Sequence, residues 1–186
     1  LLTEPAVKQV GMVKHVPGKG AWGTTVGRES ASPDERVSMK YLFVDENFID
    51  ALEIELAAGR NYSREFSTDQ TEAYIINETA VRELGWQQAE AALGEKIVWA
   101  GEPGTIIGVV KDFHFQPMHV FMQPLVLKFH PGGANNLLIR IEGDNIPETI
   151  AALQQKWIAL IPNWPFVYYF LDQDLNNLYL AEDRLG

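Results

Sequence analysis

The sequence lacks cysteine altogether across its 186 residues. Disulfide bonds, a cysteine nucleophile and thiolate metal sites are therefore excluded. The absence leaves the cellular compartment open, because a chain of this length can bury a core large enough to fold without disulfides, even where oxidation is permitted.

Basic side chains are scarce. The chain has 15 Lys and Arg against 25 Asp and Glu, a formal net charge of -10, and no cluster of basic residues. Nucleic-acid binders show such a cluster, and an acidic field repels both nucleic acid and anionic lipid surfaces. We therefore expect no nucleic-acid partner. The ordinary interpretation of the charge is solubility.

Long hydrophobic runs are also missing. The longest apolar stretches, such as "FVYYFL" at 166–171, have the length of a strand, far from the roughly 18 apolar residues of a bilayer-spanning helix. No signal peptide is visible in the sequence. We expect this segment to be soluble, and the pattern allows it to come from between two membrane spans.

Both ends of the sequence look cut. Leu1 begins the chain without an initiator Met, and no usual stop signal ends the last apolar pattern. That pattern has helical spacing and consists of Leu171, Leu175, Leu178 and Leu185. We interpret the chain as a piece of a longer protein.

What is present predicts a folded domain, because 46% of the residues are hydrophobic and 11% are aromatic. Alternating apolar residues predict strands at 37–45, 53–63, 124–129, 137–141 and 166–171, one strand within 1–16, and two within 94–115 joined by the turn "AGEPG". The stretch 17–36 is rich in Gly, Pro and Ser, which predicts a loop or hairpin around Trp22.

Three helices are expected before the helical pattern at the C-terminal end. Asp45 is a candidate N-cap for a short helix, and Asn77 is one for a helix that Gly85 ends. The longest helix spans 147–160, with Pro147 in its first turn. Its apolar stripe consists of Ile146, Ile150, Leu153, Trp157 and Leu160.

These elements predict an α+β fold with two lobes in a single domain, 1–186. Strand–helix–strand units in both outer thirds would form one lobe, from residues 1–63 plus 137–186. The β-rich middle, 64–136, would form a second, inserted lobe. The pairing of the strands stays open.

The stretch "VVKDFHFQPMH" mixes polar and apolar residues most conspicuously. His114 and Asp112 could act as a base with its orienting acid, but no nucleophile stands beside them and no G-x-S-x-G elbow occurs. The favoured interpretation is a strand leaving the sheet with Phe113 or Phe115 buried. We therefore assign no catalytic residue and expect no enzyme.

A metal site would use the three imidazoles of His114, His119 and His130, with Met118 and Met122 as further candidates. Their spacing matches no compact metal motif, so surface histidines are the favoured interpretation. The glycines of "GKGAWG" lack the spacing of a phosphate-binding loop. We expect no metal and no cofactor.

Four tryptophans, Trp22, Trp86, Trp99 and Trp164, motivate an alternative function. Exposed tryptophan often marks a binding surface, so the chain could be a stand-alone module that captures a ligand or peptide without catalysis. The favoured interpretation is that most of the four are partly buried.

Several phrases, in this order, resemble the MacB-like periplasmic core domain of FtsX-like ABC transporter permeases. They are "VDENFIDALEIELAAGRNYS" (44–63), "YIINETAVRELGW" (74–86), Gly94 with "IIGVVKDFHFQPMH" (106–119), "PLVL" (124–127) and "YLAEDRLG" (179–186). The wording "VVKDFHF" is most similar to the second such domain of Bacteroidetes-type permeases.

The resemblance implies a Porter-like lobe, 1–63 plus 137–186, and an inserted Sabre-like lobe, 64–136. It implies an inner-membrane protein with this segment in the periplasm and membrane helices at both ends. A cytoplasmic ATP-binding subunit, a second permease copy and a periplasmic or outer-membrane partner are the implied partners.

The function that the resemblance implies is mechanical. Helix 147–160, packed on strands 137–141 and 166–171, would transmit membrane-helix movement, because a close-packed core deforms little. The terminal helix from about Asp174 would be the lever. The residues that contact a partner stay unknown.

Overall fold

The structure is a computed structural model, and it describes residues 2–19, 21–116 and 120–171. In this part of the chain nine strands are present: β1 (Val7–Val13), β2 (Trp22–Arg28), β3 (Val37–Val44), β4 (Leu56–Gly59), β5 (Ala73–Asn77), β6 (Lys96–Trp99), β7 (Glu102–Val110), β8 (Leu125–Phe129) and β9 (Asn136–Ile141). The α-helices are α1 (Phe48–Ala51), α2 (Asp69–Glu72), α3 (Glu78–Glu83) and α4 (Ile146–Leu160), and three short 3-10 turns are η1 (Pro33–Glu35), η2 (Ala89–Ala92) and η3 (Pro131–Gly133). Few helices and many strands agree with the predicted mixture of α and β structure.

Six of the strands close into a ring. They follow one another in the order β2, β6, β7, β5, β8, β3, and β2 also pairs with β3. The pairs β5–β7 and β3–β8 are parallel and the other four pairs are antiparallel. We call these six strands the ring. Closing the sheet pairs both edges of β2, so that strand presents no free edge within the ring.

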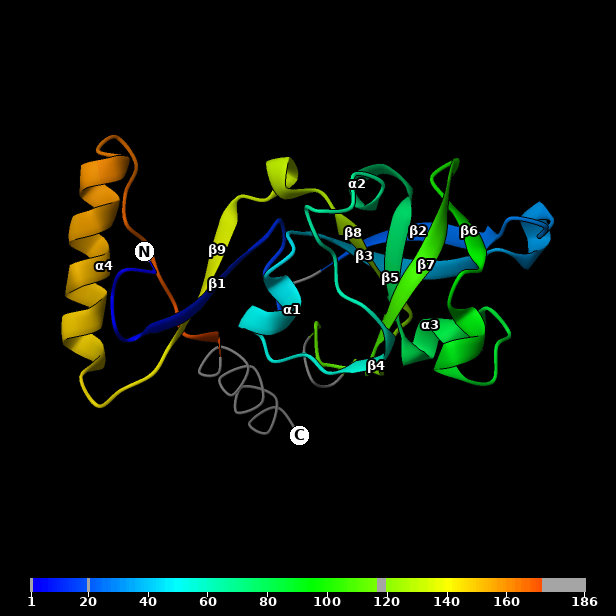
Figure 1. Cartoon of the computed structure of the whole chain (residues 1–186), viewed down its shortest axis with the longest axis horizontal. Coiled ribbons are helices and arrows are strands. Elements are labelled where there is room, and N and C mark those ends of the chain that lie inside the picture. The colour runs from blue at the N-terminus through cyan, green and yellow to red at the C-terminus, as the bar shows by residue number, and fades with distance from the viewer. Residues whose placement is uncertain (1, 20, 117–119, 172–186) are drawn as a thin grey trace, which may run out of the picture.

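The strands β1 and β9 form an antiparallel ribbon that continues the sheet beyond β3. Figure 1 shows this ribbon and α4 at one end of an elongated molecule, with β2 and β6 at the other end. We call β1, β9 and α4 the ribbon end.

The core lies on both faces of the ring strands. Every residue of β5 and of β8 is buried, as expected for short apolar runs in the middle of a sheet. One cluster on β5 contains Ile75 and packs against α1, whereas the other contains Ile76 and packs against α3. Alternation along each strand therefore feeds two cores at once.

Most predicted strands and the helix start at Asn77 are confirmed. The Asn77 side chain accepts a hydrogen bond from Ala80 N as an N-cap, and Gly85 has φ +85 just after α3. The predicted turn of "AGEPG" is a two-residue hairpin with positive φ at Ala100 and Gly101, the backbone form that suits tight hairpins.

Three local predictions need correction. The stretch 17–36 contains a full strand, β2, because β3 and β6 flank it on both sides. The strand predicted at 53–63 is confined to β4. No strand forms over 166–170, where Val167 and Tyr168 are exposed, so α4 packs on no second strand there.

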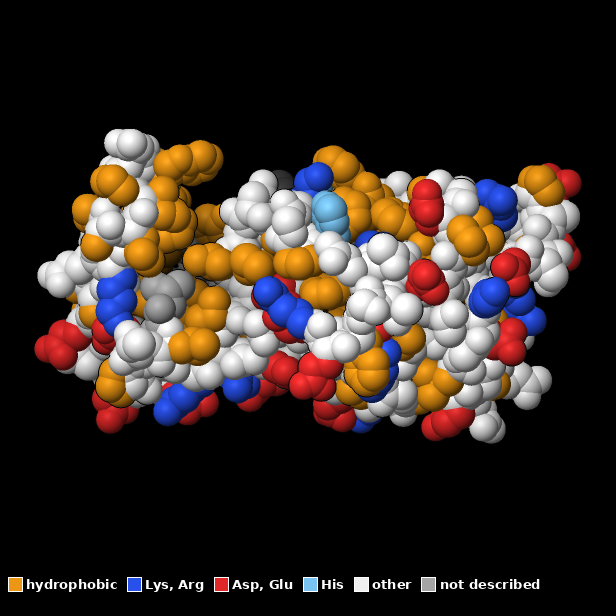
Figure 2. All heavy atoms as spheres, turned by 45° about the horizontal axis from the view of Figure 1, so that its top comes forward, with side chains coloured by type: hydrophobic (Ala, Val, Ile, Leu, Met, Phe, Trp, Pro, Cys, Tyr) orange, Lys and Arg blue, Asp and Glu red, His pale blue; other side chains and the backbone are white. Residues whose placement is uncertain are grey.

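The apolar stripe predicted for α4 is only partly buried. Leu153 is 3% exposed, but Leu160 is 73% exposed, and α4 contributes no residue to either core cluster. Figure 2 shows hydrophobic side chains gathered on the surface at this end of the molecule. The terminal helix predicted from about Asp174, with Leu175, lies outside the described residues.

The predicted lobe boundaries fall inside the continuous sheet. Strand β3, from the segment 1–63, pairs in parallel with β8, from the segment 64–136. The division into a Porter-like and a Sabre-like lobe at these boundaries stays a prediction.

Candidate functional site

The ribbon joins the ring through a short junction centred on Asp45. Strands β1 and β3 share one paired position, Val13 with Val44. Beyond it, Met12 N donates to Asp45 Oδ1 at 2.9 Å and Asp45 N donates to Met12 O at 3.1 Å. Asn47 N donates to the same carboxylate oxygen at 3.2 Å. Asp45 thus joins β1 to the end of β3, and its predicted role as an N-cap is wrong, because the N-cap position of α1 belongs to Asn47.

Helix α1 packs on β1 at Gly11. A Cβ at this position would lie 3.1 Å from Ala51 Cβ and 3.1 Å from the carbonyl of Asn47. Such contacts are tighter than ordinary van der Waals distances, so only glycine lets the helix approach this closely. We call residues 11–13, 44–47 and 51 the neck.

The neck is surrounded by further bonds and by the core. His130 N donates to Val44 O at 2.9 Å, and Asn136 Nδ2 donates to Lys14 O at 2.7 Å. Phe48 of α1 and Leu138 of β9 belong to the same buried cluster as the ring strands. The neck, the ribbon and the ring therefore share one close-packed core.

Burial raises the pKa of the Asp45 carboxyl, and the nearby Glu46 charge adds to that effect, while the N–H donors of Met12 and Asn47 oppose it. A carboxyl group held in this way links the geometry of the neck to pH.

Inside the ring, Asn77 ties α3 to two strands. Its Nδ2 donates to Asp112 Oδ1 at 2.7 Å and to Gln123 O at 3.0 Å. Its Oδ1 accepts from Ala80 N at 3.0 Å and from Leu125 N at 2.8 Å. Every hydrogen-bonding site of this fully buried amide is therefore in use.

Asp112 completes this arrangement instead of orienting a histidine. Its carboxylate accepts from Thr79 N at 3.0 Å, from Thr79 Oγ1 at 2.8 Å and from Arg82 Nη2 at 3.0 Å. The His114 side chain is exposed, and the hydrogen bonds of the described residues do not join it to Asp112. The structure therefore separates the proposed base from its proposed acid.

A second polar cluster holds α2 against the ring. Arg60 makes two bonds to the buried Asp69, Nη1 to Oδ2 at 2.6 Å and Nη2 to Oδ1 at 2.8 Å, and Ser63 N donates to Oδ2 at 3.0 Å. Burial alone would raise the pKa of Asp69, but the bonds from Arg60 and Ser63 outweigh it and hold the pKa below its usual value.

Tyr62 bridges β5 and β8. Its hydroxyl donates to Leu127 O at 2.7 Å and accepts from Ile75 N at 3.0 Å, and full burial raises its pKa. The phrase "GRNYS" thus supplies ring contacts, as do "INET" and "VVKD".

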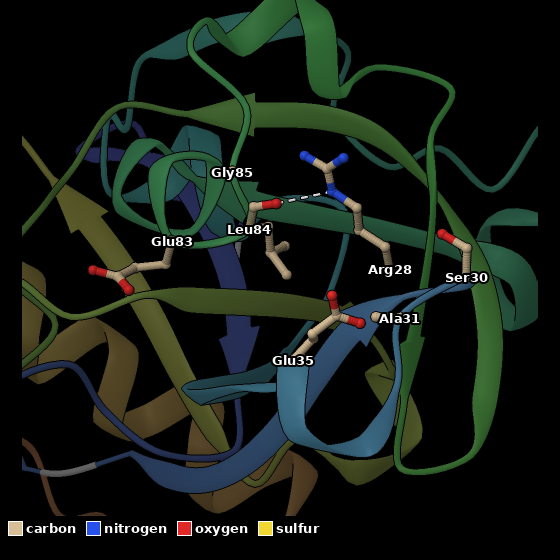
Figure 3. Close-up of a pocket in the computed structure, with 7 residues that line it drawn as sticks. All are labelled: Arg28, Ser30, Ala31, Glu35, Glu83, Leu84 and Gly85. Carbon is tan, nitrogen blue, oxygen red and sulfur yellow. Dashed lines mark hydrogen bonds between the residues drawn. The ribbon is translucent and has the colours of Figure 1, made fainter.

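An open hollow of about 410 Å³ lies beside the C-terminal end of α3 (Figure 3). Its lining consists of Arg28, Ser30, Ala31, Glu35, Glu83, Leu84 and Gly85. Arg28 Nε donates to Leu84 O at 2.8 Å, and its guanidinium lies 4.2 Å from the Trp86 ring centroid. The lining contains one guanidinium and two carboxylates, so its charge selects neither an anion nor a cation, and we assign it no ligand.

The proposed metal ligands do not converge in the described part of the chain. There, no group of three His, Asp or Glu residues is arranged to hold a metal ion. His130 is exposed and contacts Phe43 with ring centroids 5.0 Å apart, while Met122 packs against the core. His119 and Met118 lie outside the described residues.

The four tryptophans divide into two groups. Trp86 is 9% exposed and Trp99 is half-buried. Trp22 and Trp164 are 51% and 69% exposed. The expectation that most of them are partly buried is therefore wrong for Trp22 and Trp164.

Sequence reasoning missed Gly11, Tyr62 and the Arg60–Asp69 pair. A glycine inside the pattern of a strand is a signal of close backbone approach, and it could have pointed to Gly11. The other contacts join residues through the tertiary fold and leave no local signal.

The fold matches a known class of domain. The periplasmic region of MacB from Actinobacillus actinomycetemcomitans superposes with a TM-score of 0.62 at 15% identity, over 86% of this chain and 70% of that one. The extracellular domain of the ABC-type transporter YknZ from Gram-positive bacteria gives 0.59 at 15% identity, over 86% and 76%. A domain of a permease from Porphyromonas gingivalis gives 0.58 at 20% identity, over 86% and 73%. At these identities the likeness establishes the fold.

The model of the MacB-like periplasmic core domain family matches residues 2–156. The chain therefore belongs to this family. No curated protein matches its sequence. The matched region contains both the neck and the ring, and it ends within α4.

Among the helices that the structure describes, none combines the length and the apolar character that a bilayer crossing demands.

Proposed function

We propose that this domain is the periplasmic part of an ABC transporter permease of the MacB-like class, and that it carries movement from membrane helices outward. Membership of the MacB-like periplasmic core domain family supports the first statement. The neck is the single observation that carries the second, because it joins the ribbon to the ring through backbone bonds, a tight glycine contact and a shared core.

In this proposal the domain is not an enzyme. Asp112 is fully engaged in holding α3, so it is not free to act as an acid beside His114. ATP hydrolysis belongs to a cytoplasmic partner, and a second copy of the permease completes the transporter. The similarity to Bacteroidetes-type sequences supports assignment to the second periplasmic domain of a long permease.

The proposed movement begins at the ribbon end and passes to the ring, which is the more deeply packed of the two regions. Membrane helices would displace the ribbon end, and the neck would force the ring to follow as a rigid body. The ring, with strands buried on both faces, would present its surface to a periplasmic or outer-membrane partner.

The test uses the complete permease, reconstituted in lipid nanodiscs with its ATP-hydrolysing partner. A fluorophore on Gln87→Cys reports its distance from quenchers in the bilayer, since Gln87 is exposed beyond α3. We expect ATP to change the quenching. We expect Gly11→Val to abolish that change while ATP hydrolysis continues, and the open position Gly23, where a Cβ meets nothing within 4 Å, to tolerate the same substitution.

An ATP-dependent change that survives Gly11→Val would contradict coupling through the neck. ATP hydrolysis without any change in the parent protein would contradict mechanical transmission altogether.

A further inference from the structure

One surface of the ring and neck gathers aromatic rings in a continuous series. Trp22 and Tyr41 have centroids 6.0 Å apart, Tyr41 and Phe43 are 5.3 Å apart, and Trp99 lies 5.3 Å from Tyr41 and 5.9 Å from Phe43. Trp22 is exposed and the other three are half-buried. The series is therefore open to solvent along part of its length.

Two lysines flank this series. Lys14 Nζ lies 4.7 Å from the Trp22 centroid and 5.3 Å from that of Phe43. Lys128 stands beside Phe43 in the parallel register of β3 and β8, and its Nζ lies 4.5 Å from the Tyr74 centroid. We call Lys14, Trp22, Tyr41, Phe43, Trp99 and Lys128 the aromatic–lysine face.

Among the residues that the structure describes, neither ammonium group has a carboxylate partner. Within the described residues no Asp or Glu lies at ion-pair distance from Lys14 or Lys128, although the chain has 25 acidic residues. Lys128 is buried and donates one hydrogen bond, to Thr71 O at 3.0 Å. An ammonium group has three N–H donors. Those of Lys128 are covered, whereas Lys14 is only half-buried, so Lys14 is the donor on this face that a partner can reach. Burial also lowers the pKa of Lys128, and the Glu102 carboxylate opposes this.

A third donor on the same face is unsatisfied. Trp99 Nε1 is covered from solvent and has no hydrogen-bond acceptor among the described residues. Buried donors in folded proteins are nearly always paired. The face thus combines partly exposed aromatic surface with one accessible ammonium group, that of Lys14. Its chemical complement is a carboxylate beside an apolar side chain.

We propose that the aromatic–lysine face binds an acidic segment of a protein partner, in which Glu or Asp stands next to an aromatic residue. Trp and Tyr are enriched where protein–protein binding energy concentrates. The formal charge of -10 repels an extended anionic surface such as a membrane, whereas a short segment with few carboxylates can meet the ammonium group of Lys14. This binding does not depend on mechanical coupling, since it requires only the folded domain.

The probe is a synthetic peptide with blocked ends in which two glutamates flank one tryptophan, and its counterpart carries glutamines instead. Titration of the 15N-labelled chain is followed by NMR of the indole N–H signals. We expect the signals of Trp22 and Trp99 to shift, while those of Trp86 and Trp164, which lie elsewhere, stay unchanged. The glutamine peptide should bind at least about tenfold more weakly, because charge-assisted bonds are lost.

The matched variants are Lys14→Gln and Lys8→Gln. Both residues belong to the same part of the chain, but Lys8 lies near Glu142, with 4.0 Å between Nζ and Oε2, and away from the aromatic rings. We expect Lys14→Gln to weaken peptide binding about tenfold and Lys8→Gln to change it less than about twofold. An unchanged amide spectrum will show that each variant is folded.

Three results would overturn the proposal. They are equal binding of the two peptides, shifts confined to Trp164, and indole shifts at Trp22 and Trp99 that arise only with phosphatidylglycerol vesicles. The last result would assign the face to a lipid surface instead of a protein. None of these results bears on the ATP-dependent movement of the ring.

Discussion

In the ring, β5 and β8 are buried at every residue, whereas α4 at the opposite end of the molecule has one buried residue, Leu153. The ring strands have neighbours on both edges and packed side chains on both faces. Helix α4 is tied to the N-terminal turn by Lys156, whose Nζ donates to Thr3 Oγ1 at 2.6 Å and pairs with Glu4 at 2.5 Å. Both side chains are only partly buried, and ion pairs close to the surface stabilise little.

The ring and the ribbon end are expected to differ in stiffness. A body packed on two faces moves as a unit, and a helix held by one buried residue and surface bonds opens locally at lower cost. The neck lies between these two regimes and shares the core of the ring. In the proposed function, a movement applied at the ribbon end would reach the ring only as well as the neck holds its geometry.

The largest loss of stability is expected at Asn77, in the buried polar cluster of the ring. Replacing Asn77 with Ala leaves the buried N–H groups of Ala80 and Leu125 and the Gln123 carbonyl without partners. We expect the free energy of unfolding to fall by about 3–5 kcal/mol, measured by urea denaturation. Asn145→Ala is the control, because Asn145 makes no side-chain capping bond at α4. A loss below about 1 kcal/mol would show that the cluster is not a stabilising centre.

At the ribbon end, Leu153→Ala should cost about 2–3 kcal/mol because it leaves a cavity under α4. We expect the loss to be local. Amide hydrogen exchange should accelerate in α4 and stay slow in β5 and β8. The exposed Ile158→Ala is the matched variant and should have little effect. Faster exchange throughout the ring after Leu153→Ala would remove the distinction between the two regions.

The smallest expected effect is on the pH dependence of stability. It has opposite signs for Asp45 in the neck and for Asp69 in the α2 cluster. The pKa of Asp69 is lowered in the folded chain. Its contribution to stability is therefore present above the pKa of the unfolded chain, about 3.9, and is lost as pH falls through the folded pKa. The pKa of Asp45 is raised, so its contribution is present below that value and lost as pH rises through the folded pKa.

Urea unfolding of the parent, Asp69→Asn and Asp45→Asn between about pH 3 and pH 7 tests these signs. The stability advantage of the parent over Asp69→Asn should shrink as pH falls. Its advantage over Asp45→Asn should shrink as pH rises. Slopes of the same sign would contradict the environments assigned to the two carboxyl groups.

Local signals predicted the local elements well. Asn77 caps α3 and Gly85 ends it because both choices depend on backbone groups within a few residues. The same reasoning failed at Asp45, where a donor 33 residues away, Met12 N, takes the carboxylate oxygen. Propensity favoured a strand at 166–171, but a strand needs a neighbour that donates and accepts its hydrogen bonds.

Strand β2 and the neck show why the rest could not be predicted. The segment "WGTTVGR" has glycines that indicate a loop, and it becomes a strand because β3 and β6 provide both ladders. Gly11 matters only because α1 passes over it. The phrases within 44–63, 74–86, 106–116 and 124–127 lie in the region that the family model matches. Several of their residues make structural contacts in the ring and the neck, such as Asp45, Tyr62 and Asn77. The phrase at 179–186 lies outside the described residues.

The most direct test of the account measures the orientation of the two ends across the neck. The chain has no cysteine, so spin labels on Gln154→Cys in α4 and Gln87→Cys beyond α3 report one distance by pulsed electron resonance. We expect a narrow distribution in the parent and in Gly23→Val, and a broad or shifted one in Gly11→Val. A distribution that Gly11→Val leaves unchanged would contradict the claim that the neck fixes the ribbon to the ring.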